Sequence, residues 1–99
     1  MTRRTLSLTT PARRDLRSIR RYSIESWGRE QTETYISLLL STAESLCEFP
    51  ERGWLVSGES TNVHRVMIGR HVIYYRILES EIEIIRILHE RMDASSLFG

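Results

Sequence analysis

The chain begins with a short alternation of polar and apolar residues and then changes to a helical period. Residues 5–8 alternate, which predicts a short strand with one buried face. Thr10 followed by Pro11 predicts a helix start, because a threonine hydroxyl can cap free amides and proline fits the first turn. Apolar positions in residues 12–27 recur every three or four residues until Gly28, so we expect an amphipathic helix there.

A second helical pattern follows directly. Residues 29–48 carry a broad apolar stripe, and Pro50 cannot continue a helix. Only Gly28 separates the two patterns, so the sequence predicts an antiparallel helical hairpin.

The second half of the chain has the pattern of a β-sheet. Residues 51–62 are rich in turn-forming residues, with Trp54 as their one large apolar group, and we expect a surface loop. Three β-rich segments follow at residues 63–68, 71–78 and 82–88, separated by turns too short for anything but an antiparallel meander. The last segment is apolar on both faces from Ile84 onward, which is typical of an internal strand.

These elements predict an α+β fold in the order β-α-α-β-β-β, with both helices on one face of the sheet, in a single domain spanning residues 1–99. Two helices can cover only one face of a four-stranded sheet, so the other face needs a different cover. A partner chain would provide it. The alternative is that the C-terminal tail, with Met92, Leu97 and Phe98, folds back over that face.

Composition narrows the class of protein. No apolar run is long enough to cross a bilayer and the N-terminal residues lack a secretory pattern, so we expect a cytoplasmic protein. Cys47 is the only cysteine, which excludes an internal disulfide. Its apolar setting favours a buried small side chain over a catalytic thiol.

Charge is distributed unevenly along the chain. All 14 basic residues are arginines, and residues 1–21 hold seven of them against Asp15 alone, a net charge of +6. Arginine pairs bidentately with phosphates and carboxylates, so this region can seek phosphates or an acidic protein partner. A solvated helix face is the alternative interpretation.

Titratable residues gather where the last strand ends. Arg86, His89, Glu90, Arg91 and Asp93 lie there, with Tyr75 and Arg76 on the neighbouring strand. RNA cleavage needs a base, an acid and cations around the phosphate, which a histidine and arginines can supply. Structural hydrogen bonds and ion pairs are the alternative role of such residues.

Other chemistry finds no support in the sequence. His64 and His71 lie on strands without an acid or cysteine at ligand spacing, so we expect no metal site. The glycine-rich loops that hold phosphates are absent from the sequence, and we expect no cofactor.

The chain resembles a known family over nearly its whole length. The segments that carry the resemblance are P-A-R-R-D-L-R-S-I-R-R-Y-S-I-E-S-W-G (Pro11–Gly28), Q-x-x-x-Y (Gln31–Tyr35), F-P-E-R-G (Phe49–Gly53), G-R-H-V-I-Y-Y-R (Gly69–Arg76) and I-I-R-I-L-H-E-R-M-D (Ile84–Asp93). They resemble the ParE branch of the RelE/ParE toxins. The resemblance implies a type II toxin–antitoxin module, in which a ParD-like antitoxin wraps the toxin in a hetero-oligomer.

The resemblance implies a protein that binds its target and is not an enzyme. ParE-type toxins are taken to poison DNA gyrase, which here would involve contacts from Arg86, His89, Arg91 and Met92. The residues expected to face the antitoxin, or the core in the case of the apolar ones, are Arg13, Arg17, Arg20, Leu16, Ile19, Trp27 and Tyr35. This interpretation involves no membrane and no direct contact with nucleic acid.

Two alternatives remain open at this point. A ribosome-dependent mRNA endonuclease of the RelE type would use His89 as acid or base, with Arg86, Arg91 and Arg76 on the phosphate. The chain departs from the RelE pattern, since it has no lysine and no tyrosine after Tyr75. A degenerate member that binds only its antitoxin is the other alternative.

Overall fold

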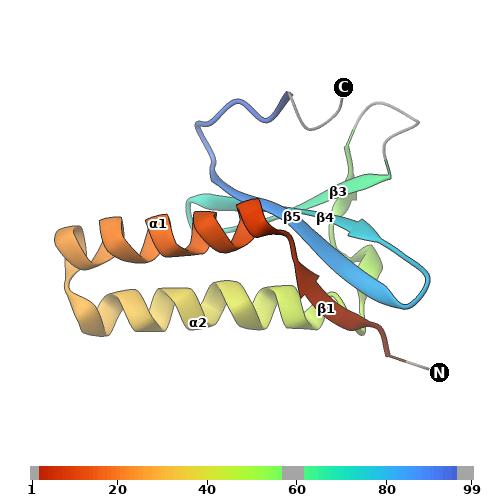
Figure 1. The fold of residues 1–99 in the computed structure, drawn as a ribbon, viewed down its shortest axis with the longest axis horizontal. Helices are drawn as coiled ribbons and strands as arrows, with labels where there is room; N and C mark the ends of the chain where they lie inside the picture. The colour runs from red at the N-terminus through yellow and green to blue at the C-terminus, as the bar shows by residue number, and fades with distance from the viewer. Residues whose placement is uncertain (1–2, 57–61, 96–99) are drawn as a thin grey trace.

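The computed structural model describes residues 3–56 and 62–95. Its elements, in chain order, are β1 (Thr5–Leu8), α1 (Thr10–Trp27), α2 (Arg29–Ser45), the 3-10 turn η1 (Pro50–Arg52), β2 (Trp54–Leu55), β3 (Val63–Ile68), β4 (His71–Ile77) and β5 (Glu81–His89). The two helices form the predicted antiparallel hairpin (Figure 1). The predicted α+β class is confirmed.

The strands form one sheet in the order β1-β5-β4-β3-β2. The meander β3–β4–β5 is antiparallel, as predicted, whereas β1 pairs with β5 in parallel. β5 therefore lies between two neighbours, and the expectation of an internal strand is confirmed.

The sheet has a fifth strand where the sequence predicted only a loop. β2 is two residues long, and Trp54 and Leu55 pair with Arg65 and His64 of β3. Both β2 residues are exposed, so the alternation of buried and exposed positions that reveals a strand is missing here. The part of the predicted loop at 57–61 lies outside the described residues.

The helix ends differ slightly from the prediction. Thr9, and not Thr10, caps α1, because its hydroxyl accepts the Ala12 N–H at 3.1 Å. Gly28 separates the helices with φ 87°, a conformation that favours glycine. α2 ends at Ser45, and Leu46 and Cys47 follow it in a turn with both side chains buried.

The main core lies between the helices and the sheet. It contains residues from both helices and from the three meander strands, including Leu39, Ile73, Tyr75, Ile82 and Ile84. Burying each large aliphatic side chain contributes about 1.5–3 kcal/mol. Burial also raises the pKa of the Cys47 thiol, which suits a packed side chain rather than a nucleophile.

The other face of the sheet carries a second, smaller cluster. It contains Val63, Val72, Tyr74 and Leu88 from the strands, with Ile85 and Val56 packed against it. Ala94 from the C-terminal segment joins this cluster, and that segment leaves the sheet on the side opposite to α2 (Figure 1).

Of the C-terminal segment within the described residues, Ala94 alone packs on this face of the sheet. Met92, which was expected to cover it, lines a different surface. Leu97 and Phe98 lie outside the described residues. Within residues 3–56 and 62–95, no helix is long and apolar enough to cross a membrane.

A candidate recognition groove between α1 and β5

The start of α1 replaces β1 as the neighbour of β5. β1 ends at Leu8, opposite Ile84. Beyond that point the Thr9 N–H donates to the Ile84 carbonyl at 3.0 Å, and the Thr9 hydroxyl donates to the Ile85 carbonyl at 2.7 Å. The same threonine that caps α1 therefore ties the helix to the strand.

One turn further on, Asp15 completes this attachment. Its two carboxylate oxygens accept hydrogen bonds from Nε and Nη2 of Arg86, both at 2.8 Å, and Oδ2 also accepts the Ile87 N–H at 2.9 Å. These bonds raise the pKa of Arg86. A bulge in the pairing with β4 lies between the partners of Tyr74 and Tyr75, at the level of Arg86. The pair fixes the position of α1 against this end of β5.

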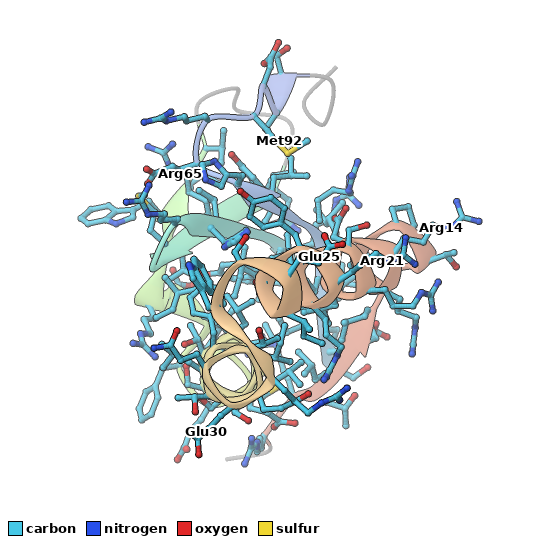
Figure 2. The ribbon with its side chains drawn as sticks, turned by 90° about the vertical axis from the view of Figure 1, so that its left-hand side faces the viewer. Arg14, Arg21, Glu25, Glu30, Arg65 and Met92 are labelled. Carbon is cyan, nitrogen blue, oxygen red and sulfur yellow. The ribbon has the colours of Figure 1, made fainter. Side chains whose placement is uncertain are left out.

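Beside this attachment lies a groove of about 580 Å³ between α1 and the end of β5. Its exposed surface is mostly apolar, and apolar or aromatic and polar side chains line it in equal number: Asp15, Ser18, Ile19, Tyr22, Ser23 and Trp27 from α1, and Arg70, His71, Ile87, Leu88, His89 and Met92 from the sheet and the segments beside it. Met92 lies on the side of α1 opposite to α2 (Figure 2). We call this surface the α1–β5 groove.

A chain of four aromatic rings extends from α1 through α2 to the sheet at this groove. Trp27 meets Tyr35 edge-on with ring centroids 6.1 Å apart, Tyr35 lies 5.5 Å from His71, and His71 lies 5.5 Å from His89. The two histidines occupy paired positions on β4 and β5. The chain joins the hairpin to the end of the meander.

Tyr35 is held at the centre of this chain by polar contacts. Its hydroxyl oxygen lies 2.6 Å from Nδ1 of His71 and accepts the Arg70 N–H at 3.2 Å. Burial raises the pKa of Tyr35. Burial lowers the pKa of His71, and the neighbouring His89 lowers it further, so the neutral imidazole is favoured.

His89 is the ring of this chain nearest the C-terminal segment. Its Nδ1 accepts the Arg91 N–H at 3.1 Å, which places the proton of the neutral ring on Nε2. Within the described residues, no group of three or more histidine, cysteine, aspartate or glutamate side chains is placed to hold a metal ion.

The groove brings together residues that the sequence assigned to two different partners. Ile19 and Trp27 were expected to face the antitoxin, and His89 and Met92 the target; all four line it. Tyr35, which does not line the groove itself, contacts Trp27. Neither set is tested by the geometry, and both remain predictions.

The remaining predicted residues lie elsewhere. Leu16 packs against the main core, to which Ile19 of the groove also belongs. Arg13, Arg17 and Arg91 are exposed, and Arg20 is exposed and paired with Glu33. Arg86 points to Asp15, so its Nε and Nη2 are engaged within the chain.

The residues proposed for ribonuclease chemistry are not brought together. Arg76 pairs with Glu83 at 3.3 Å and lies five positions along β4 from His71, the strand partner of His89. At 3.3 Å per residue this separation is about 16 Å. Arg86 is already paired with a carboxylate. A phosphate beside His89 would therefore have Arg91 and Arg70 nearby, without Arg76.

Sequence reasoning missed several residues of the groove. Asp15 appeared only as the single acid in a basic segment, and His71 only as an unsuitable metal ligand. The one signal for the Asp15–Arg86 pair was a lone charge in an apolar strand, which needs a buried counter-charge. Tyr22, Ser18 and Arg70 gave no sequence signal of this kind.

Comparison with known proteins places this fold in a class. The structure matches one titled "Chromosomal ParDE TA system from P. aeruginosa" with a TM-score of 0.75 at 20% identity, covering 87% of this chain and 95% of that one. It also matches the toxin–antitoxin complex RelBE2 from Mycobacterium tuberculosis, with a TM-score of 0.69 at 24% identity, covering 90% and 93%. This chain therefore shares its fold with a chain of each of these two toxin–antitoxin systems.

Sequence comparison identifies the family within this class. Residues 6–94 match the model of the ParE toxin of the type II toxin–antitoxin system parDE. Toxin ParE1 of Caulobacter vibrioides is 36% identical over 92 residues, covering 93% of this chain and 95% of the relative. Toxin ParE1 of Mycobacterium tuberculosis is 28% identical over 87 residues, covering 87% and 89%. The chain belongs to the ParE toxin family.

Proposed function

We propose that this toxin acts in the cytoplasm by binding DNA gyrase, and that a ParD-like antitoxin neutralises it by covering the α1–β5 groove. The observation that carries the proposal is the lining of that groove, which combines two of the residues expected to contact the target, His89 and Met92, with two of those expected to contact the antitoxin, Ile19 and Trp27. One partner would then exclude the other directly. No conformational change of the toxin is required.

The composition of the groove supports recognition of a protein. Trp27 and Met92 are 47% and 56% exposed, and Tyr22 is 68% exposed, so three large side chains are available for burial by a partner. Aromatic residues and methionine are enriched in the buried centres of protein interfaces. Arg70 and His89 provide hydrogen-bond donors at the rim.

The same composition disfavours catalysis by this surface. A phosphate-cleaving site needs several cations converging on the reacting group. Here Arg86 is neutralised by Asp15 and Arg76 by Glu83. A binding role therefore accounts for the groove better than a ribonuclease role does.

Binding measurements with purified proteins test the shared groove. We expect Trp27→Ala and Met92→Ala to weaken binding of both the antitoxin and gyrase by about 10-fold or more, as truncation of an interface anchor does. Trp54→Ala is the matched control, because Trp54 is 75% exposed on β2, far along the sheet from β5. It should leave both affinities unchanged.

Competition is the second part of this test. Gyrase should not bind a toxin already saturated with antitoxin. If both partners bind the same toxin molecule, or if the groove variants affect only one partner, the shared surface is wrong.

A further inference from the structure

The outer face of α1 has an unusual composition. Between Arg13 and Arg21, the exposed residues are Arg13, Arg14, Arg17, Ser18, Arg20 and Arg21. Arg14, Arg17 and Arg21 recur at intervals of three and four residues, which aligns them on one side of the helix. Figure 2 shows Arg14 and Arg21 on the same side of α1, with Glu25 beyond them. We call Arg14, Arg17 and Arg21 the arginine ridge.

The ridge is not neutralised within the chain. Arg3, Arg20, Arg76 and Arg86 each pair with a carboxylate. Among residues 3–56 and 62–95, the side chains of Arg14, Arg17 and Arg21 form no ion pair or hydrogen bond. Asp15, the acid nearest to Arg14 and Arg17 in sequence, is occupied by Arg86.

The ridge works against the stability of its own helix. The N-terminus of a helix carries partial positive charge, and α1 has no acidic residue in its first turn. Arg14 and Arg17, and likewise Arg17 and Arg21, are like charges at neighbouring positions of the helix surface, which repel each other. An anionic partner would relieve this repulsion, because it would neutralise the like charges of the ridge.

Two kinds of polyanion fit this charge, an acidic protein segment or a nucleic-acid backbone. The energetic centre of a protein interface combines aromatic side chains with arginine in a desolvated pocket, whereas residues 13–21 expose arginines and a serine with no aromatic side chain among them. Interfaces with nucleic acid are more polar and strongly positive, and arginine pairs bidentately with phosphate. The rise of the helix, about 1.5 Å per residue, spaces the backbones of the three arginines about 4.5 and 6 Å apart along one side of α1.

We propose that the arginine ridge binds the phosphate backbone of duplex DNA. The resemblance implied antitoxin contacts for Arg13, Arg17 and Arg20 and no direct contact with nucleic acid; at Arg17 the composition of the exposed face favours DNA instead. Ile19 and Tyr22 line the groove and the ridge points elsewhere, so the toxin can hold DNA while the groove is occupied. The proposal does not depend on gyrase being the target.

Fluorescence anisotropy of a short labelled DNA duplex with purified toxin tests this proposal. The triple variant Arg14→Gln, Arg17→Gln, Arg21→Gln should bind at least 10-fold more weakly than the unaltered toxin at about 50 mM salt. The slope of log affinity against log salt should fall by about one for each arginine removed. The matched control removes three exposed arginines outside α1, as Arg29→Gln, Arg52→Gln, Arg65→Gln.

The outcomes separate the alternatives. Loss of binding in the ridge variant, with the control unchanged, supports the proposal. Equal loss in both triple variants means a general effect of net charge and overturns it. Tighter binding of single-stranded RNA or of a glutamate-rich peptide than of the duplex overturns the assignment to DNA. The gyrase and antitoxin affinities of the ridge variant, measured separately, show whether the groove still functions.

Discussion

Asp15 and Arg86, 71 positions apart, form a bidentate ion pair that fastens the first helix to the end of the last strand. The side chain of Asp15 is 13% exposed and that of Arg86 32%. The carboxylate also accepts a backbone N–H of β5, so it satisfies three donors at once. The groove beside this pair depends on the position of α1, and so on this contact.

Removing the charge of Asp15 should destabilise the fold. Asp15→Asn leaves a half-buried guanidinium without its counter-charge, and we expect a loss of about 2–3 kcal/mol in the free energy of unfolding. Glu33→Gln is the control, because its pair with Arg20 is exposed on both sides, and it should cost about 0.5 kcal/mol or less. Urea denaturation measures both values. Equal effects would contradict the role of the Asp15–Arg86 pair.

Gly28 and Gly69 both have positive φ, but only Gly69 is crowded by a neighbouring side chain, so alanine substitutions at the two positions distinguish backbone strain from a steric clash. A Cβ at Gly28 meets nothing within 4 Å, whereas a Cβ at Gly69 would lie 2.7 Å from the Tyr35 ring. Gly28→Ala should cost about 1–3 kcal/mol, because φ 87° with ψ 170° is a backbone conformation that glycine alone adopts readily. Gly69→Ala should cost this and about 1–3 kcal/mol more for overpacking. Thermal unfolding of the two variants checks the difference, and a Gly69 variant as stable as the Gly28 variant would contradict the close approach of Tyr35.

The stability of the fold should fall in mild acid through His71. Its pKa is lowered by burial and by His89, with Glu90 acting in the other direction, so the unfolded chain binds a proton there more readily than the folded chain. The contribution is complete above the ordinary value of 6.5 and is lost as the pH falls from there toward the folded pKa. His71→Gln removes this contribution.

Urea unfolding at about pH 7.5 and about pH 5.5 measures this effect. The unaltered toxin should lose more stability between these conditions than the His71→Gln variant does. The same loss in both proteins would show that another group titrates, and would contradict the assignment to His71.

Substitutions in and just after the last strand should have two different effects, one on folding and one on binding. Ile84 is fully buried, and Ile84→Asp should abolish folding, because an unpaired charge in the core costs several kcal/mol. Arg91 is exposed, and the Arg91→Ala variant should fold normally but bind the target or the antitoxin more weakly. Circular dichroism melting curves distinguish these outcomes. A normal melting curve for Ile84→Asp would show that the core is misplaced.

Hydrophobic periodicity predicted the helices and the meander because each buries a regular apolar face. The two-sided apolar pattern of β5 was enough to predict an internal strand, and both core clusters draw on it. β2 was missed because its two residues are exposed and are held only by pairing with β3. The end of α2 was predicted three residues late because Leu46 and Cys47 continue its apolar spacing in a turn.

The site was only partly predictable for a different reason. His89 and Met92 were visible as polar or flexible residues after an apolar strand, and Trp27 as a large residue at a helix end. That they line one groove depends on the crossing of α1 over β5, which Thr9 and Asp15 fix by contacts more than 70 positions away. No periodicity within either segment carries that information.

We propose that this member of the ParE family acts by binding gyrase through the α1–β5 groove. A supercoiling assay with purified gyrase, relaxed plasmid and purified toxin tests it most directly. We expect the toxin to stop supercoiling, Trp54→Ala to match it, and Trp27→Ala, Met92→Ala or saturating antitoxin to restore supercoiling. Unchanged supercoiling at micromolar excess of folded toxin would contradict the claim.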